Sequence, residues 1–382
     1  MKILLAFDSF KGCMTSLQAG EAARLGVLSA MPDAEADVLV VADGGEGMSA
    51  AVYANGTGEV VTADTVDPLL RPICAEYTYD CQAQSAYIDF AAASGLTLLA
   101  DAEKSAVKST SFGTGMLMAD AIRHGAQHIF LGLGGSATND AGLGALQALG
   151  AKFTDESGCE ITHAYCGADM VHTCGIDTSA LATSLRGIRL TLLCDVDNPF
   201  CGQHGAVAVF ARQKGAAEDE MRLLEEGMNR VGEVMKKCGF TDVFQLRGAG
   251  AAGGAGGGFA ALAGGEIVPG AESVLTLCGF GDKLAGCDLV MTGEGKSDSQ
   301  TLAGKLPYTV MTTARRHGVP TALFCGAAED VDALKAAGFA AVVDINSPMK
   351  SGDFMSADVA SQRLSAAVSD CLTAGAVLRG RE

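Results

Sequence analysis

Five polar, glycine-rich turns divide this chain of 382 residues, and each follows an apolar strand or opens a helix. They lie at residues 8–12, 43–47, 134–140, 195–199 and 292–301. Strands that leave through such turns into helices are typical of α/β proteins, in which parallel strands carry polar loops at their carboxyl ends. The pattern therefore predicts an α/β fold whose turns gather into one composite ligand site.

The two ends of the chain share the alternation of strand and helix that builds a parallel sheet. Apolar strands are predicted at residues 3–7, 38–41, 289–292, 321–325 and 340–345. Short alternating runs rich in Thr, Tyr and Val at residues 57–90 instead predict antiparallel strands. We expect a discontinuous Rossmann-like domain with a doubly wound parallel sheet from residues 1–56 and 286–382. Residues 57–285 are expected to form an inserted second α/β domain with a mixed sheet, with the active site in the cleft between the two domains.

Two helices have clear signals in the sequence. Thr15 and Gln18 form a capping-box pattern, which predicts a helix that begins at about residue 16. Residues 218–237 carry apolar side chains at helical spacing, with acids first, lysines last and Gly239 just beyond. We expect this second helix to be part of the scaffold.

Charge and cysteine usage exclude several classes of partner. The chain has 27 Lys and Arg against 45 Asp and Glu, and its net charge of −18 repels nucleic-acid phosphates and anionic lipids. Its apolar runs are too short for a signal peptide or a membrane span. Thirteen cysteines, an odd number without a C-x-x-C pair, predict reduced thiols. We therefore expect a cytoplasmic protein with no nucleic-acid and no membrane partner.

The segment GGSATND at residues 134–140 follows a strand and is expected to open a helix. Free backbone N–H groups and the helix dipole hold phosphate in that arrangement. The segment is neither a GxGxxG fingerprint nor a P-loop, and a tight turn that needs glycine for packing is the alternative. The candidate phosphate-binding residues are Gly134, Gly135, Ser136, Ala137, Thr138 and Asn139.

A second glycine-rich segment, at residues 248–258, precedes an apparent helix at Phe259. Its backbone could form a cradle for the phosphates of a nucleotide or substrate. A flexible linker and a close-packed helix start are the alternatives. The candidate residues are Gly253, Gly254, Gly256 and Gly257.

The turn DVDNP contains two carboxylates, Asp195 and Asp197, spaced by one residue. Together with the amide of Asn198 they could hold Mg²⁺ or accept the proton of a hydroxyl group. The same residues also make an ordinary Asx turn, so both interpretations stay open.

The segment at residues 292–301, with Lys305 beyond it, combines a strand end with acids, lysines and hydroxyls. Glu294 and Asp298 are its carboxylates, and Lys296 and Lys305 are candidate phosphate partners. In the first turn, Lys11 could neutralise a carboxylate or a phosphate of the substrate.

A cluster of cysteines and histidines raises the question of a metal site. Its members are Cys159, His163, Cys166, His172 and Cys174. Thiolates and imidazoles are ligands of soft metals, but the spacing matches no standard zinc pattern. Chance clustering is the favoured interpretation.

Together the motifs resemble the type I glycerate kinase family. They read ILLAFDSFKG, VADGGEG, GLGGSATNDAG, CDVDNPFCG, GAGAAGGAGGGF and MTGEGKSDSQTLAGK, in matching order and spacing over essentially the full chain. The resemblance implies an ATP-dependent kinase that phosphorylates D-glycerate with Mg²⁺, and a Rossmann-like domain with an inserted second domain. One departure is Lys296, where the family usually has arginine, so the charge is kept but a bidentate contact is lost.

Phosphoryl transfer needs positioning and charge neutralisation, so we assign roles to individual residues as hypotheses. Asp195 is expected to orient or deprotonate the glycerate hydroxyl, and Lys305 and the two glycine-rich loops are expected to bind ATP. The catalytic set is Asp195, Lys11, Lys296 and Asp298. The substrate-binding set is Asp8, Ser9, Lys11, Asp43, Gly44, Gly45, Glu294 and Gln300. The expected Mg²⁺ ligands are Asp197, Glu294 and Asp298.

The expected product is 2-phosphoglycerate, because many bacterial members resemble glycerate 2-kinases. A glycerate 3-kinase and a kinase of a related short hydroxy acid or triose are the alternatives, and a non-catalytic small-molecule-binding protein is an alternative of another class. A dinucleotide-dependent oxidoreductase is disfavoured, because no GxGxxG follows the first strand. A monomer or a homodimer is expected.

Overall fold

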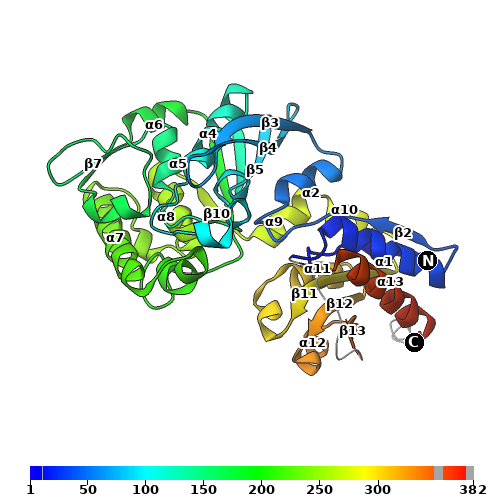
Figure 1. Ribbon diagram of the computed structural model, residues 1–382. Coiled ribbons are helices and arrows are strands. Elements are labelled where there is room, and N and C mark those ends of the chain that lie inside the picture. Colours follow the sequence, from blue (N-terminus) through cyan, green and yellow to red (C-terminus); the bar gives the residue numbers. More distant parts are fainter. Residues whose placement is uncertain (11, 348–355, 376–382) are drawn as a thin grey trace. The chain divides into compact units, whose positions relative to one another are not determined.

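The computed structural model describes residues 1–10, 12–347 and 356–375 of the chain. The chain forms two compact units, unit 1 from Met1–Asp43 with Ala271–Glu382 and unit 2 from Gly44–Gly270 (Figure 1). The sequence placed these boundaries near residues 57 and 285. The first boundary differs because the helix α2 (Met48–Ala54) packs on the sheet of unit 2, where Ser49 Oγ donates a hydrogen bond of 3.0 Å to Thr78 Oγ1.

The sheet of unit 1 is parallel and is built from both ends of the chain, as predicted. Its strands are β1 (Lys2–Leu5), β2 (Glu35–Val38), β11 (Leu289–Ser297), β12 (Thr321–Ala328) and β13 (Ala341–Asp344). They lie in the order β13-β12-β11-β1-β2. The strand β2 ends at Val38, where the sequence predicted a strand over residues 38–41 to begin. The apolar Leu39, Val41 and Ala42 are buried in the loop that follows β2, so this apolar run marks a buried loop and not the strand.

Helices cover both faces of this sheet, with α1 (Ser16–Ala30) and α13 (Ala357–Thr373) on one face and α11 (Leu306–Arg316) and α12 (Val331–Ala337) on the other. The other helices of unit 1 are α9 (Gly270–Leu277), α10 (Phe280–Lys283) and the 3-10 helix η7 (Ser299–Ala303). The predicted cap of α1 is confirmed, since Thr15 Oγ1 accepts from the Gln18 N–H and Gln18 Oε1 from the Thr15 N–H. The helices α1 and α13 lie side by side (Figure 1). A Cβ on Gly26 would lie 2.3 Å from the Ser365 carbonyl oxygen, so glycine permits their close approach.

Unit 2 has the mixed sheet that the sequence predicted. Its strands are β3 (Glu59–Val66), β4 (Pro72–Asp80), β5 (Ser85–Asp89), β6 (His128–Gly132), β9 (Arg189–Leu193) and β10 (Glu266–Val268). They lie in the order β10-β9-β6-β5-β4-β3. The strands β3, β4 and β5 pair antiparallel, whereas β5, β6, β9 and β10 run parallel. A separate antiparallel pair joins β7 (Lys152–Thr154) to β8 (Gly175–Asp177).

The remaining elements of unit 2 surround this sheet. The α-helices are α2, α3 (Ala91–Ser94), α4 (Phe112–Arg123), α5 (Leu143–Ala148), α6 (Ser179–Ser184), α7 (Glu218–Lys237) and α8 (Ala251–Ala263). The short elements are η1 (Leu96–Leu98), η2 (Asp101–Glu103), η3 (Gly167–His172), the π-helical η4 (Val207–Ala211), η5 (Arg212–Lys214) and η6 (Val243–Gln245). The helix α7 has the predicted bounds and buries Leu224, Met228, Val231 and Met235.

Two further features bear on the expected class of protein. Within the described ranges, no helix combines the length and the apolar character needed to cross a membrane. All thirteen cysteines lie in the described ranges, and none of them forms a disulfide.

Candidate functional site

The carboxyl ends of the parallel strands of unit 2 carry several of the predicted residues. Asp89 ends β5, residues 133–142 follow β6, Asp195 follows β9 and Gly270 follows β10. Because these strands are neighbours in the sheet, their loops lie along one edge. The predicted loop 134–139 and the predicted base Asp195 are therefore brought to the same edge.

The loop 44–47 crosses this edge in contact with two of the strand ends. A Cβ on Gly134 would lie 2.6 Å from the Gly45 Cα, and a Cβ on Gly44 would lie 2.3 Å from the Gly270 Cα. Gly44 also has a φ of +83°, a conformation that other residues rarely adopt. Gly44 and Gly45, predicted as substrate-binding residues, thus let the loop approach the strand ends closely.

Asp89 was missed by the sequence analysis and anchors this loop. Its Oδ2 accepts from the Gly47 N–H at 2.8 Å and its Oδ1 accepts from the Ser49 N–H at 3.2 Å. Burial raises the pKa of Asp89 to about 7, although these two hydrogen bonds act in the opposite direction. The feature of the sequence that could have pointed to Asp89 is its position at the end of a strand.

Asp89 leads to a prediction about stability and pH. An unfolded chain has an Asp pKa of about 4, so the folded chain holds the extra proton between about pH 4 and 7. The free energy of unfolding of the parent, relative to that of Asp89→Asn, should therefore fall as the pH rises through this range. Urea denaturation at a series of pH values measures the difference, and a difference that does not change with pH contradicts the prediction.

Asp195 combines a fixed position with access to solvent. Its Oδ1 accepts a hydrogen bond of 2.7 Å from the Gly270 N–H, and the residue is exposed. The hydrogen bond orients the carboxylate at the strand ends. A carboxylate held in this way can orient a substrate hydroxyl and accept its proton.

Asp197 is engaged differently from Asp195. Its Oδ2 accepts a hydrogen bond from the Arg247 guanidinium, and both side chains are exposed. Arg247 lies just before the glycine-rich segment and was not singled out in the sequence. The pair brings a cation to the loop that follows β9.

The loop 134–140 does not open a helix directly, which corrects the expectation. The strand β6 ends at Gly132, and the short helix α5 begins only at Leu143. Ala141 and Gly142 both have positive φ and form a turn before the helix, and the Ala137 N–H donates to the Ser94 carbonyl oxygen at 2.8 Å. The dipole of α5 therefore contributes little at this loop. A phosphate site here would have to be formed by the backbone and side chains of the loop.

Asp140 fastens the end of this loop to the core. It is fully buried and accepts hydrogen bonds from the Ser111 N–H at 2.8 Å, from Ser111 Oγ at 2.7 Å and from the Gly142 N–H at 3.1 Å. Burial raises the pKa of Asp140, and these hydrogen bonds oppose the rise.

The glycine-rich segment 248–258 is packed against the rest of unit 2. Residues 251–259 are buried, which favours the close-packed helix start among the three alternatives. A Cβ on Gly254 or Gly257 would lie within 3.0 Å of the Phe200 ring, and one on Gly256 would lie 2.6 Å from the Gly248 carbonyl oxygen. ATP contact by these glycines stays a prediction.

The two glycine-rich loops contact each other. The Ala141 N–H donates a hydrogen bond of 3.1 Å to the Gly253 carbonyl oxygen. A Cβ on Gly253 would lie 2.1 Å from the Thr138 carbonyl oxygen. Ala252, Gly253 and Gly254 all have positive φ, which produces a kink at the start of α8. The structure thus makes one packed assembly of the two predicted phosphate cradles.

Unit 1 gathers other predicted residues at the carboxyl edge of its own sheet. The strands β1 and β11 are neighbours, and the Asp8 N–H donates to the Gly293 carbonyl oxygen at 2.9 Å. Asp8 is buried, and its Oδ1 accepts from the Ser9 N–H at 2.7 Å. Asp43 belongs to unit 1 and is half-buried. Lys11 lies outside the described residues.

Glu294 is buried among donors of its own chain. Its Oε1 accepts hydrogen bonds from Ser297 Oγ at 3.0 Å and from Thr301 Oγ1 at 2.7 Å, and its Oε2 lies 3.6 Å from Lys305 Nζ. The carboxylate therefore ties the end of β11 to η7 and to the start of α11. This arrangement gives Glu294 a structural role.

The contacts of Glu294 predict a loss of stability in Glu294→Gln. Removing the charge weakens the hydroxyl bonds and the contact with Lys305, and we expect the free energy of unfolding to fall by about 1–3 kcal/mol. Urea denaturation measures the change. The matched control is Glu329→Gln, whose exposed carboxylate pairs with Lys296 and should change stability by less than about 1 kcal/mol. Equal effects of the two substitutions would contradict the structural role of Glu294.

The remaining predicted residues of unit 1 lie just after Glu294. Lys296 Nζ lies 3.1 Å from a Glu329 oxygen and 3.6 Å from an Asp298 oxygen, and the Glu329 carboxylate raises the pKa of Lys296. Asp298 caps η7 by accepting from the Gln300 N–H at 2.9 Å, and Gln300 is exposed. Lys296 is thus an exposed cation held beside two carboxylates.

The predicted Mg²⁺ ligands belong to both units, Asp197 to unit 2 and Glu294 and Asp298 to unit 1. Over the part of the chain that the structure describes, no group of three or more His, Cys, Asp or Glu side chains is arranged to hold a metal. Glu294 is buried, which disfavours it as a direct ligand, whereas Asp197 is exposed and Asp298 is partly exposed. Mg²⁺ is commonly held by one or two accessible carboxylates together with the phosphates of a bound nucleotide, a pattern that Asp197 and Asp298 fit better than Glu294.

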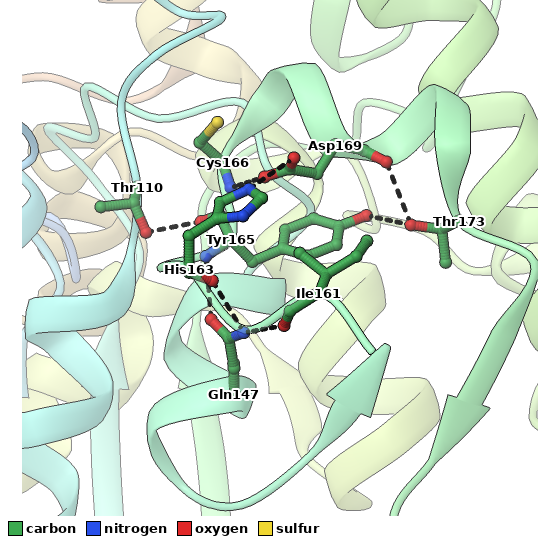
Figure 2. A network of polar contacts seen from close by, with 8 residues as sticks. All are labelled: Thr110, Gln147, Ile161, His163, Tyr165, Cys166, Asp169 and Thr173. Carbon is green, nitrogen blue, oxygen red and sulfur yellow. Dashed lines mark hydrogen bonds and ion pairs between the residues drawn. The ribbon is translucent and has the colours of Figure 1, made fainter. Parts of the chain in front are cut away.

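Two members of the cysteine and histidine cluster, His163 and Cys166, lie in a polar network around residues 161–173 (Figure 2). His163 Nε2 lies 2.8 Å from Asp169 Oδ1, and Asp169 Oδ2 accepts from the Cys166 N–H at 2.8 Å. Tyr165 bonds to Thr173 through its hydroxyl. Hydrogen bonds within the protein hold this segment in its conformation.

Lys214 is the functional candidate that sequence reasoning missed most clearly. It ends η5 and is 2% exposed. Its Nζ donates to Ser136 Oγ and to the Thr138 carbonyl oxygen, each at 2.7 Å. A lone lysine in the largely apolar stretch 205–217 was the available signal.

Comparison with known proteins places the chain among relatives of one kind. A model described as the glycerate kinase family matches residues 3–373. The chain is 38% identical over 320 residues to a glycerate kinase of Bacillus cereus (strain ATCC 10987 / NRS 248), covering 84% of each chain. It is 38% identical over 330 residues to the glycerate 2-kinase of Escherichia coli (strain K12), covering 86% of each. A crystal structure named glycerate kinase 2, from Salmonella typhimurium LT2, has a TM-score of 0.82 at 36% identity and covers 98% of this chain and 99% of its own.

Proposed function

Because this chain belongs to the glycerate kinase family, whose members are phosphotransferases, we propose that it transfers the terminal phosphoryl group of ATP to D-glycerate, giving 2-phosphoglycerate and ADP. The family that the motifs indicated is confirmed by these matches. The 2-phosphoglycerate product is supported by the relative from Escherichia coli, which is named a glycerate 2-kinase.

The observation that carries the proposed chemistry is the position of Asp195. It lies at the same sheet edge as the loop 134–139, and the Gly270 N–H orients its carboxylate. In the proposed reaction a glycerate hydroxyl gives its proton to Asp195 while its oxygen bonds to the terminal phosphorus. The bond from that phosphorus to the bridging oxygen breaks, and ADP leaves. Positioning and charge neutralisation provide most of the catalysis in such a transfer.

The residues of unit 1 supply charge and substrate contacts in this proposal. Lys296 and Lys305 hold anionic oxygens of the substrates, and Lys11 is proposed for the same role. Asp8, Ser9, Asp43 and Gln300 are the proposed substrate contacts of unit 1, and Gly44 and Gly45 are the proposed substrate contacts of unit 2. Mg²⁺, when bound with ATP, neutralises phosphate charge, and we propose Asp197 and Asp298 as the carboxylates available to it.

A coupled assay tests the proposal directly. The purified protein is incubated with ATP, Mg²⁺ and D-glycerate, and the product is detected through enolase alone or with phosphoglycerate mutase added. Turnover through enolase alone is expected and identifies a 2-kinase, whereas dependence on the mutase identifies 3-phosphoglycerate. Activity only with tartronate, glycolate or dihydroxyacetone would show that the acceptor is not D-glycerate. Ligand binding without ADP formation would overturn the kinase proposal.

A further inference from the structure

Lys214 is a buried cation beneath the loop 134–139. In the described ranges it is the only Lys or Arg residue that is buried. An ammonium group loses much hydration free energy on burial, so it is retained only where partners compensate for that loss. Its partners are a hydroxyl and a carbonyl oxygen of the same loop, although the loop is far from Lys214 in sequence.

The two hydrogen bonds fasten the loop at two points. Ser136 and Thr138 are two residues apart, and Lys214 Nζ donates to both at 2.7 Å. On its other side the Thr138 carbonyl oxygen is confined by Gly253, where a Cβ would approach to 2.1 Å. The position of the loop backbone is therefore restricted by Lys214 on one side and by α8 on another.

The same loop contains buried polar groups that lack a partner. Thr138 and Asn139 are 0% exposed, and no hydrogen bond reaches Thr138 Oγ1 or either polar atom of the Asn139 side chain. Buried polar atoms in native proteins are nearly always paired with protein groups, water or a ligand. These atoms are thus available to a polar group that enters the loop.

One buried cation and one exposed carboxylate lie beside the loop: Lys214, and Glu46, whose Oε2 lies 3.2 Å from the position of a Cβ on Gly135. The segment 134–140 contains no basic residue, and its one charged residue is Asp140, which is bonded to Ser111. Lys214 supplies the positive charge that the loop itself lacks. Burial lowers the pKa of Lys214 to about 7, while the Asp140 carboxylate acts to raise it. A phosphate group nearby would act in the same direction as Asp140.

We propose that Lys214 is a positioning residue for phosphoryl transfer, which holds the loop 134–139 in the conformation that receives the phosphates of ATP. The inference rests on the proposed function and extends it to a residue outside the recognised motifs. Lys214 acts by holding the loop in place, and the positive charge of its ammonium group attracts the negatively charged phosphates.

The test compares Lys214→Met, Ser136→Ala and the double variant with the parent. Lys214→Met keeps an unbranched side chain but removes the charge and both hydrogen bonds, and we expect it to raise the KM for ATP about tenfold or more. The KM for D-glycerate should stay within about twofold of the parent, because the proposed contact of the acceptor hydroxyl is Asp195 and not this loop. Ser136→Ala removes one acceptor and should raise the KM for ATP about threefold. The double variant should match Lys214→Met, since the two changes remove the same interaction.

A surface lysine provides the matched control. Lys152→Met removes an exposed ion pair with Glu160 in the same unit and should leave both KM values as in the parent. A folded Lys214→Met protein with the parental KM for ATP would overturn the inference, and so would an equal rise of both KM values. If Lys214→Met does not fold, Ser136→Ala decides alone, and an unchanged KM for ATP overturns the inference.

A measurement of ATP binding tests the role of Lys214 independently of the proposed function. Isothermal titration calorimetry with ATP is carried out on the parent and on Lys214→Met, without an acceptor. A parent that binds ATP at least about tenfold more tightly than the variant supports the role of Lys214, even if D-glycerate is not phosphorylated. Equal affinities overturn it, even if the parent is an active glycerate kinase.

Discussion

Asp195→Asn is expected to lower kcat/KM for D-glycerate phosphorylation by about 10²–10⁴-fold. The substitution keeps the size of the side chain and an acceptor for the Gly270 N–H, but it removes the group that takes the hydroxyl proton. The loss should fall mainly on kcat, because the proton moves in the transition state. Steady-state kinetics in the coupled assay, with stability followed by thermal melting, measures the effect.

The same pair of strands offers a control for this substitution. Glu266 lies at the start of β10, at the opposite end from Gly270, and pairs at 3.7 Å with Arg189 at the start of β9. Glu266→Gln should therefore leave kcat/KM within about twofold of the parent. A folded Asp195→Asn protein that keeps kcat/KM within a few fold of the parent would show that Asp195 is not the base.

Gly253→Ala is expected to destabilise unit 2 by about 3 kcal/mol or more. Two effects add at this position. A φ of +67° costs an L-residue roughly 1–2 kcal/mol. The added Cβ would also lie 2.1 Å from the Thr138 carbonyl oxygen, so the loop that Lys214 holds would have to move. Urea denaturation and the KM for ATP measure the two consequences.

Gly264→Ala separates the clash from the strain. Gly264 caps the same helix with a φ of +68°, but a Cβ there meets nothing within 4 Å. We expect this control to cost only the conformational strain, about 1–2 kcal/mol, and to keep the KM for ATP of the parent. Equal destabilisation by the two substitutions would contradict the close approach of Gly253 to Thr138.

The two predicted phosphate cradles thus depend on each other. The sequence treats residues 134–140 and 248–258 as separate motifs, whereas the hydrogen bond from Ala141 to Gly253 joins them. Gly253 and Gly258 permit this packing, since a Cβ there would lie 2.1 Å from the Thr138 carbonyl oxygen and 1.9 Å from the Ala141 carbonyl oxygen. The loop 134–139 has the buried, unpartnered polar atoms, so it is the stronger candidate for contact with a ligand.

Much of the scaffold followed from local patterns in the sequence. Thr15 and Gln18 are three residues apart, which is the spacing that a capping box needs, and the apolar residues of 218–237 recur at helical spacing. The site edges were also predictable, since the carboxyl ends of parallel strands share one edge of a sheet. This is why Asp195 and the loop 134–139 could be assigned to one edge before the strand order was known.

Local sequence patterns were enough to predict the family, the α/β class, the parallel sheet built from both chain ends and the main polar loops. The tertiary structure decided that α5 begins after the loop 134–140, that Asp89 anchors the loop 44–47 and that Lys214 lies beneath Ser136 and Thr138. The physical reason is the range of the interactions. Caps and helical faces depend on residues a few positions apart, whereas burial and hydrogen bonding of Lys214 join segments 78 residues apart.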